Sequence, residues 1–459
     1  MGGRSCANRS RAGNGDESAD VHTSMMAPAA ARRIGTFPDP ARVFPVRILL
    51  WHGYLLGGTG SNVYSRALAR EWSRAGHDVT VLCQERHPEL YDTGSAVVVR
   101  PELGTRLPVF VLDEYEGLEA VLLQDMPRDE RHRYVEANAR AIRELAPADL
   151  LFTNHLLLGG PVGAASGLPF RVKAHGSELE YSMRGRPELI EWARESLAAA
   201  EAVYVGSEHI RAVVDEVMGR VERVVEVPPG VDVDLFHPRP RAEALAGLLE
   251  EARRDPPNPG SRNDRLPDEG NAERLEAFLA GDRPTVVFVG KLIENKGVQV
   301  LFEALRGLDA RAVIVGFGDY REELEAIAPP DTIFTGALEH RHLQYLVPLA
   351  DVSVVPSIFP EAFGMVAAEA AAAGVPPVVA RHSGLAEVAA GIEREYPPGL
   401  GGLAGFENGD AADLEAKLRR LLALPVVERQ ALGEAARRAV VERWSWTAVA
   451  RRLLAPVEG

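Results

Sequence analysis

Short apolar runs alternate with amphipathic stretches along most of the chain. The first run, VRILLW at 46–51, is followed by a glycine-rich turn, a stretch with helical spacing and a second run, VTVLC at 79–83. This alternation is typical of βαβ units, in which a parallel sheet is buried between two layers of helices. We therefore predict a doubly wound domain over 45–238, with further strands at 108–113, 149–154, 171–176, 202–207 and 224–228.

The alternation stops in the segment 239–283, which is dense in proline, glycine and charge. It holds six basic and ten acidic residues between Arg241 and Asp282. We interpret the segment as an exposed polar insertion or linker with short helices at 242–253 and 272–280.

The alternation then restarts and predicts a second doubly wound domain over 284–435. Its strands are expected at 285–290, 312–316, 332–336, 352–357 and 377–380. The remaining segment, 436–459, has apolar residues at helical spacing, with Trp444 and Trp446 as packing anchors. We expect this C-terminal helix to pack back across the domains.

The first 44 residues are polar and lack the continuous apolar core of a signal peptide, so we interpret 1–44 as a disordered tail. The most apolar long window, Phe363–Ala380, contains a glutamate and two prolines and is too broken to span a bilayer. A cytoplasmic location is the expectation.

The composition argues against some classes of function. The chain has 459 residues, 51 Lys and Arg against 66 Asp and Glu, and a net charge of −15. Such a charge argues against a nucleic-acid partner, because displacing counterions from phosphates requires a positive face. The two cysteines, Cys6 and Cys83, form no disulfide or zinc pattern.

The sharpest local motif is EAFGMVAAE, from Glu361 to Glu369, directly after a predicted strand. Glu361 falls in the loop and Glu369 one turn into the following helix, while the backbone N–H groups of 363–366 have no helical partner. This suits a ligand with hydroxyls at one end and a phosphate or ribose at the other. A loop carboxylate beside a solvated helical glutamate is the alternative interpretation.

A second motif, VGKLIENKG at 289–297, places Lys291 and Lys296 after a strand. Two ammonium groups there can offset the charge that grows on a departing diphosphate, although two surface lysines would look the same. Glycine-rich turns at Gly58 and at Gly316 and Gly318 also follow strands, but none completes a dinucleotide fingerprint. They predict tight turns that allow close approach of a phosphate or nucleobase.

Two histidines, His155 and His175, follow strands on the side expected to face the ligand, although a lone histidine is more often a buried structural residue. Asp232 and Asp234 resemble a metal clamp, but their proline-flanked setting favours a turn or connector, and we predict no metal site. An arginine stripe along the helix predicted at 62–75 is compatible with peripheral membrane contact or a phosphorylated acceptor. It is more often a solvated face.

Taken together, these segments resemble the retaining family-4 glycosyltransferases of GT-B fold, an α/β architecture of two doubly wound Rossmann-like domains facing a central cleft. The resemblance runs along the chain from 46 to 455 apart from 241–282. It is carried by the motifs GGTGSNVYSRALAREWSRAGHDVTVL, KAHGSELEY, VGSEHIRAVV, VPPGVDVDLFHP, VGKLIENKGVQVLFEAL, GFGDYREELE and VPSIFPEAFGMVAAEAAAAGVPPVVARHSGLAEV.

The resemblance implies a nucleotide-diphosphate sugar as donor substrate, bound mainly by the second domain, no separate cofactor, and an acceptor held mainly by the first. Lys291 and Lys296 match the family's basic pair on the diphosphate, although many members have arginine at the first position. Glu361 and Glu369 match the family's paired glutamates on the donor sugar and the ribose. Gly58 matches the phosphate loop, and His155 matches the histidine beside the transferring sugar.

The motif at 361–369 assigns backbone contacts with the nucleotide to Phe363, Gly364, Met365 and Val366. Backbone groups near Gly316, Gly318 and Gly336 are expected to contact the nucleobase. The expected reaction is hexose transfer with retention by front-face attack, without a metal. A nucleotide-sugar 2-epimerase and a noncatalytic sugar-nucleotide binding module remain as alternatives. The acceptor is open: a sugar, a lipid or a small metabolite.

Overall fold

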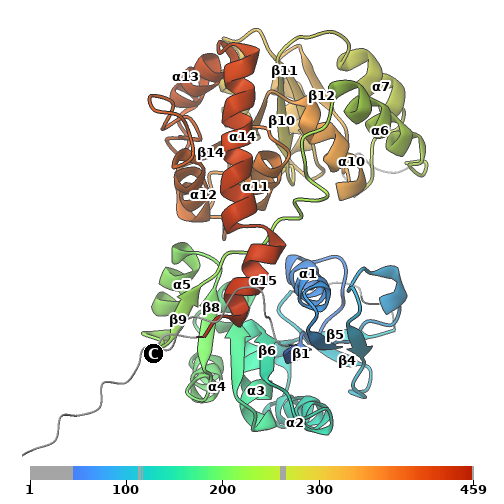
Figure 1. The fold of residues 1–459 in the computed structure, drawn as a ribbon, viewed down its shortest axis with the longest axis vertical. Helices are drawn as coiled ribbons and strands as arrows, with labels where there is room; N and C mark the ends of the chain where they lie inside the picture. The colour runs from blue at the N-terminus through green and yellow to red at the C-terminus, as the bar shows by residue number, and fades with distance from the viewer. Residues whose placement is uncertain (1–44, 112–114, 116, 259–264, 457–459) are drawn as a thin grey trace, which may run out of the picture. The chain divides into compact units, whose positions relative to one another are not determined.

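The computed structural model describes residues 45–111, 115, 117–258 and 265–456 (Figure 1). The segment 1–44, predicted as a disordered tail, lies outside the described residues, as does Cys6. Cys83 is a buried free thiol. No helix within the described ranges is long and apolar enough to cross a bilayer.

The first domain is built on a seven-stranded parallel sheet of order β3-β2-β1-β6-β7-β8-β9. Its strands are β1 Arg47–Trp51, β2 Asp78–Leu82, β3 Val97–Val99, β6 Leu150–Asn154, β7 Phe170–Lys173, β8 Ala202–Val205 and β9 Val224–Glu226. The order reverses between β1 and β6, where Ile48 is in register with Val79 on one side and Leu150 on the other. In such sheets ligands bind beyond the carboxyl ends of the strands at this reversal.

Both faces of that sheet are covered, which explains why its strands have continuous apolar sequences. Ile48 and Leu50 of β1 face α1 Gly60–Arg74 and α15 Trp446–Leu454. Leu49 and Trp51 face the opposite way. The helices on that side are α2 Arg128–Glu144, α3 Gly160–Ser166, α4 Pro187–Leu197 and α5 Glu208–Met218.

One predicted strand does not belong to this sheet. The run at 108–113 is predicted as a main-sheet strand, but β4 Arg106–Val109 pairs with β5 Glu119–Leu122 in a separate two-stranded sheet. Pro108 has no N–H group to donate to a ladder, which disfavours a central position. The sequence prediction also missed β3 and β5, which are short and only partly buried.

The second domain is built on a six-stranded parallel sheet of order β12-β11-β10-β13-β14-β15. Its strands are β10 Thr285–Val289, β11 Arg311–Val315, β12 Thr332–Phe334, β13 Val352–Val355, β14 Pro377–Ala380 and β15 Gly405–Phe406. Its later helices are α8 Val298–Leu305, α9 Arg321–Ile327, α10 His340–Leu346, α11 Met365–Ala372, α12 Ser383–Glu393, α13 Ala411–Leu422 and α14 Val426–Arg443. The five strands predicted for this domain are present, and the two-residue β15 was missed.

The segment 239–283 belongs to the core of the second domain. The predicted helices are confirmed as α6 Arg241–Arg253 and α7 Asn271–Phe278. The prediction that the segment is exposed is wrong, because Leu248 and Leu275 are fully buried in the same hydrophobic cluster as β10 and β11. The charged residues of these two helices lie mostly on their exposed faces.

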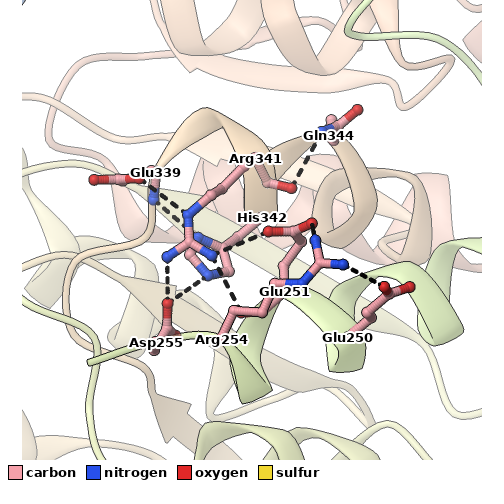
Figure 2. A network of polar contacts seen from close by, with 8 residues as sticks. All are labelled: Glu250, Glu251, Arg254, Asp255, Glu339, Arg341, His342 and Gln344. Atoms are coloured by element: carbon pink, nitrogen blue, oxygen red, sulfur yellow. Dashed lines mark hydrogen bonds and ion pairs between the residues drawn. The ribbon is translucent and has the colours of Figure 1, made fainter. Parts of the chain in front are cut away.

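A polar network fastens α6 to α10 (Figure 2). His342 Nε2 lies 2.9 Å from Asp255 Oδ1, and Arg341 pairs with both Asp255 and Glu251. His342 is fully buried and Asp255 is nearly so, which makes the contacts specific rather than solvent-screened. The insertion is therefore held by its charges as well as by its leucines.

The chain ends by crossing from one domain to the other (Figure 1). α14 packs against α11 of the second domain, and α15 packs against α1 of the first. Trp446 at the start of α15 stacks edge-on with Tyr64, their ring centroids 5.4 Å apart. The indole N–H of Trp72 donates to the carbonyl of Ala450 at 3.0 Å.

Candidate active site

A single cavity of about 900 Å³ is lined by residues of both domains, and it holds ten of the twelve predicted site residues. Its volume is near the upper end for small-molecule sites, which suits a ligand as long as a nucleotide sugar. The ten residues are Gly58, His155, Lys291, Lys296, Glu361, Phe363, Gly364, Met365, Val366 and Glu369. We call this space the central cavity.

The two lysines reach the central cavity from the turn after β10. Lys296 ends a short 3₁₀ turn, η5 Glu294–Lys296, and its Nζ forms an ion pair with Glu361 Oε1. The side chains of Lys296 and Glu361 are 30% and 25% exposed, so the pair is open to a ligand. Lys291 also lines the cavity and is exposed.

The backbone of Glu361 is held by the first turn of α12. Its backbone N–H donates to Ser383 Oγ at 2.8 Å, and its carbonyl accepts from the N–H of Gly384 at 3.0 Å. A Cβ at Gly384 would lie 2.5 Å from the Cα of Phe363, so only glycine allows this approach. The contacts fix the carboxylate at the edge of the cavity beside Lys296.

The helix α11 begins at the cavity wall. Gly364 precedes it with φ +129°, where a Cβ would lie 2.8 Å from Leu385. The N–H groups of the first turn, including those of Met365 and Val366, have no intrahelical acceptor and carry the positive end of the helix dipole. Phe363 contributes backbone only, because its ring is buried against Trp444 at 5.4 Å.

Glu369 lies one turn into α11 and is 12% exposed. Burial raises the pKa of its carboxyl to about 8. His340, at the start of α10, places Nε2 3.6 Å from Glu369 Oε1. His340 was not predicted, because it lies six residues beyond the end of β12 and not directly after a strand as His155 does.

His155 forms the opposite wall with a group of aromatic rings. It is 2% exposed, and its ring centroid lies 4.6 Å from that of His175, 5.0 Å from Phe110 and 5.3 Å from Tyr54. His175 also lines the cavity. Both histidines predicted from their positions after strands therefore lie together.

The glycines have two different roles. Gly58 has φ +90° and nothing within 4 Å of its Cβ position, so it lies at the open mouth of the loop before α1. Gly316 and Gly318 are not among the residues that line the cavity. A Cβ at these positions would lie 1.8 Å from the carbonyl oxygen of Gly290 and 2.4 Å from that of Leu292, so they allow two loops to cross.

The sequence analysis did not single out Lys173, which lines the cavity, and it expected the arginine stripe of the first helix to be mainly a solvated face. Lys173, at the end of β7, donates to the carbonyl of Val227 at 2.6 Å, and burial lowers the pKa of its amine to about 7. Arg66 and Arg70, part of the arginine stripe, line the cavity instead of facing only solvent. Arg70 pairs with Asp232 at 2.8 Å.

Asp232 is occupied by structural contacts. Besides its pair with Arg70, its Oδ1 accepts the N–H groups of Asp234 and Leu235 at 3.2 and 3.0 Å. This is the hydrogen-bonded turn that an aspartate commonly forms with the backbone that follows it. The connector interpretation of the Asp232-Val233-Asp234 triplet agrees with these contacts.

Comparison with known proteins matches both halves of the chain. Residues 58–235 match the model described as Glycosyltransferase Family 4, and residues 271–439 match that of Glycosyl transferases group 1. A relative from Mycobacterium tuberculosis is named GDP-mannose-dependent alpha-(1-6)-phosphatidylinositol monomannoside mannosyltransferase. It is 28% identical over 61% of this chain and 66%, just under two thirds, of its own length.

Solved structures show the same fold. Sucrose-phosphate synthase from Thermosynechococcus elongatus superposes with a TM-score of 0.58 at 21% identity, over 89% of this chain and 97% of that one. Anabaena Alr3699/HepE, in complex with UDP and glucose, superposes with a TM-score of 0.59 at 17% identity, over 89% and 98%. With both halves matched and the two-sheet architecture shared, the chain belongs to the GT-B glycosyltransferases, with a family-4 first domain and a group 1 second domain.

Proposed function

We propose that the protein transfers a hexose from a nucleotide-diphosphate sugar to an acceptor hydroxyl, with retention of the anomeric configuration and without a metal. One observation carries the proposal: Lys291, Lys296, Glu361 and Glu369 line a single cavity, with His155 among the groups of the first domain that close it. If these side chains lay far apart, the reaction would have no site.

The second domain provides the groups for the donor. Lys291 and Lys296 would neutralise the diphosphate, and the N–H groups at the start of α11 add a second source of positive potential. Glu361 would accept hydrogen bonds from sugar hydroxyls once Lys296 turns to the phosphates. Glu369, one turn further along α11, would contact the ribose hydroxyls.

The first domain provides the acceptor side. Tyr54, Phe110 and His155 give this wall both apolar rings and polar atoms, a combination that suits a hydroxylated acceptor. The relative's printed name describes a phosphatidylinositol-based acceptor. Lipid and sugar acceptors are therefore the first classes to test.

The reaction balances without an added reagent. The acceptor oxygen bonds to the anomeric carbon on the face from which the diphosphate leaves, while the bond between that carbon and the phosphate oxygen breaks. The acceptor proton passes to the departing phosphate oxygen, and the products are a glycoside and a nucleoside diphosphate. The lysines stabilise the departing charge, which is the role a divalent cation would otherwise take.

The test is a panel of UDP-, GDP- and ADP-sugars, beginning with GDP-mannose because of the mycobacterial relative's name. A bound donor raises the melting temperature by mass action, and turnover releases nucleoside diphosphate. We expect the anomeric configuration of the product to match the donor, and the rate to persist in EDTA. An inverted product would refute the front-face mechanism, and loss of activity in EDTA that Mg²⁺ restores would refute metal independence.

The same panel separates the alternatives. Epimerised sugar nucleotide without acceptor would indicate a 2-epimerase, and binding with no turnover for any acceptor would indicate a binding module. Both family models that match the chain describe glycosyltransferases, so neither alternative is favoured.

A further inference from the structure

A buried carboxylate lies directly beside His155. Glu178, the first residue of the π-helical turn η4 Glu178–Met183, is fully buried. Its Oε2 lies 3.3 Å from His155 Nδ1, while its Oε1 accepts the N–H groups of His175 at 3.0 Å and of Leu156 at 3.4 Å. Each carboxylate oxygen thus has its own partners, and one of them is the histidine ring.

The backbone around His155 is held in an uncommon conformation. His155 has φ +67°, which is rare for a residue with a side chain, and it opens a second π-helical turn, η3 His155–Gly159. A Cβ at Gly159 would lie 2.3 Å from the carbonyl oxygen of Asn154, so the turn closes only with glycine there. Such local strain persists where the surroundings impose it, and it concentrates at functional sites.

The ionisable groups around His155 leave Glu178 as its charged partner. Burial lowers the pKa of His52 to about 3 and that of His175 well below its ordinary value, so both rings are neutral near pH 7. Burial also disfavours the Glu178 carboxylate, but its contact with His155 and the backbone N–H donors outweigh it, and the pKa of Glu178 is lowered. Other ionisable groups near this cluster are the phenols of Tyr54 and Tyr64 and the Lys173 amine.

The second ring nitrogen of His155 is left without a partner. Nε2 is buried and has no hydrogen bond within the described residues, although His155 lines the central cavity. A buried polar atom is costly unless something pairs with it, and a bound ligand is the group that this cavity would supply.

We propose that Glu178 is a positioning residue for the transfer reaction. It accepts a hydrogen bond from Nδ1–H of His155 and so fixes the tautomer in which Nε2 is an acceptor for a hydroxyl of the bound substrate. This inference rests on the proposed function, because it assigns a task to the histidine on the acceptor side of the same cavity.

The decisive variant is Glu178→Gln. The glutamine side-chain oxygen can still accept hydrogen bonds from the backbone N–H groups of His175 and Leu156. In that orientation the NH₂ group points toward His155 Nδ1. Nδ1 must then accept, and Nε2 becomes a donor. We expect kcat to fall about 10- to 100-fold, the size of the loss when the partner that orients a metal-bound histidine is removed. Glu178→Asp, which keeps the charge, should restore part of the loss.

The matched control is Glu180→Gln. Glu180 lies in the same turn, but it is exposed and pairs with Arg184 at 2.9 Å. We expect its kcat to stay at the wild-type value. Equal kcat in Glu178→Gln and the wild type, with both folded by melting temperature, would overturn the proposal.

A spectroscopic measurement tests the tautomer without any activity assay. In two-bond ¹H–¹⁵N spectra of protein labelled at histidine, we expect the His155 ring to be the Nδ1–H tautomer, and the Nε2–H tautomer in Glu178→Gln. The resonance is assigned by its loss in His155→Gln. An Nε2–H tautomer in the wild type would overturn the proposal even if Glu178→Gln fails to fold. A correct tautomer in a protein without transferase activity would instead count against the proposed function.

Discussion

Replacing Lys296 by alanine separates the proposed electrostatic role of this residue from its contribution to folding. In the free protein its ammonium pairs only with the Glu361 carboxylate among the contacts described, and both side chains are about a quarter to a third exposed. Partly solvated pairs contribute about 0–1 kcal/mol, so the variant should unfold within a few degrees of the wild type. Its folded structure should therefore be available for kinetic comparison.

The catalytic effect should be far larger. If Lys296 stabilises charge on the departing diphosphate, its removal should lower kcat by about 10²- to 10³-fold, equivalent to about 2.7–4 kcal/mol of transition-state stabilisation. The assay is the initial rate of nucleoside diphosphate release with acceptor present and donor saturating. Lys296→Arg, which keeps the charge, should retain more activity than the alanine variant.

The matched control is Lys417→Ala, because Lys417 lies on α13 outside the cavity lining and pairs with Asp413 at 3.7 Å. We expect no change in its kcat. A Lys296→Ala enzyme with kcat within twofold of the wild type would refute the role of this lysine in departure of the diphosphate. A rise in KM alone would show that Lys296 contributes uniform binding and nothing specific to the transition state.

Three further predictions concern pH and stability. Because the pKa of Glu369 is raised from 4.5 to about 8 in the folded protein, the folded state binds more protons than the unfolded state between these values. The free energy of unfolding should therefore fall as pH rises through this range, by about 1.4 kcal/mol per pH unit relative to the Glu369→Gln variant. The measurement is urea unfolding of both proteins at several pH values. The same pH dependence in both would contradict the prediction. Asp255→Ala leaves buried His342 without its carboxylate partner and removes one of the carboxylates that Arg341 contacts. It should lower the free energy of unfolding by about 3 kcal/mol with kcat unchanged, measured by urea unfolding and initial rates. Trp446→Ala should lower the free energy of unfolding by about 3–5 kcal/mol, because the indole ring packs on Gly230 and Tyr64. A shift in the urea midpoint that corresponds to less than about 1 kcal/mol would show that α15 is dispensable for the first domain.

The β-strands of both sheets were largely predictable because their signal is local. Buried parallel strands such as β1 and β10 have mostly apolar sequences with a glycine one or two residues after the strand, and helices follow them at short intervals. β3 and β5 lack that signal, being short and only partly buried. The place of 106–109 in a separate sheet depends on which strand it pairs with, and no local pattern specifies that.

The segment 239–283 shows why composition can mislead. Its proline, glycine and charge predict exposure, yet α6 and α7 bury leucines against the second sheet, and Asp255 meets a histidine about 90 residues later in the chain. Average polarity cannot distinguish a solvated helix from one whose buried face is narrow. The contact of α6 with α10 decides that this segment is packed and not exposed, and only the three-dimensional structure shows that contact.

The amino-acid order alone was enough to indicate two parallel sheets, the strand ends where chemistry would gather, and the lysines and glutamates that now line the central cavity. Burial and long-range contact had to decide which glycines line the cavity and which let loops cross, as at Gly316, and that Glu178 lies beside His155. The physical reason is range: apolar periodicity and turn chemistry act between near neighbours in the chain, whereas pKa shifts, ion pairs and unpartnered polar atoms arise from groups that only folding brings together.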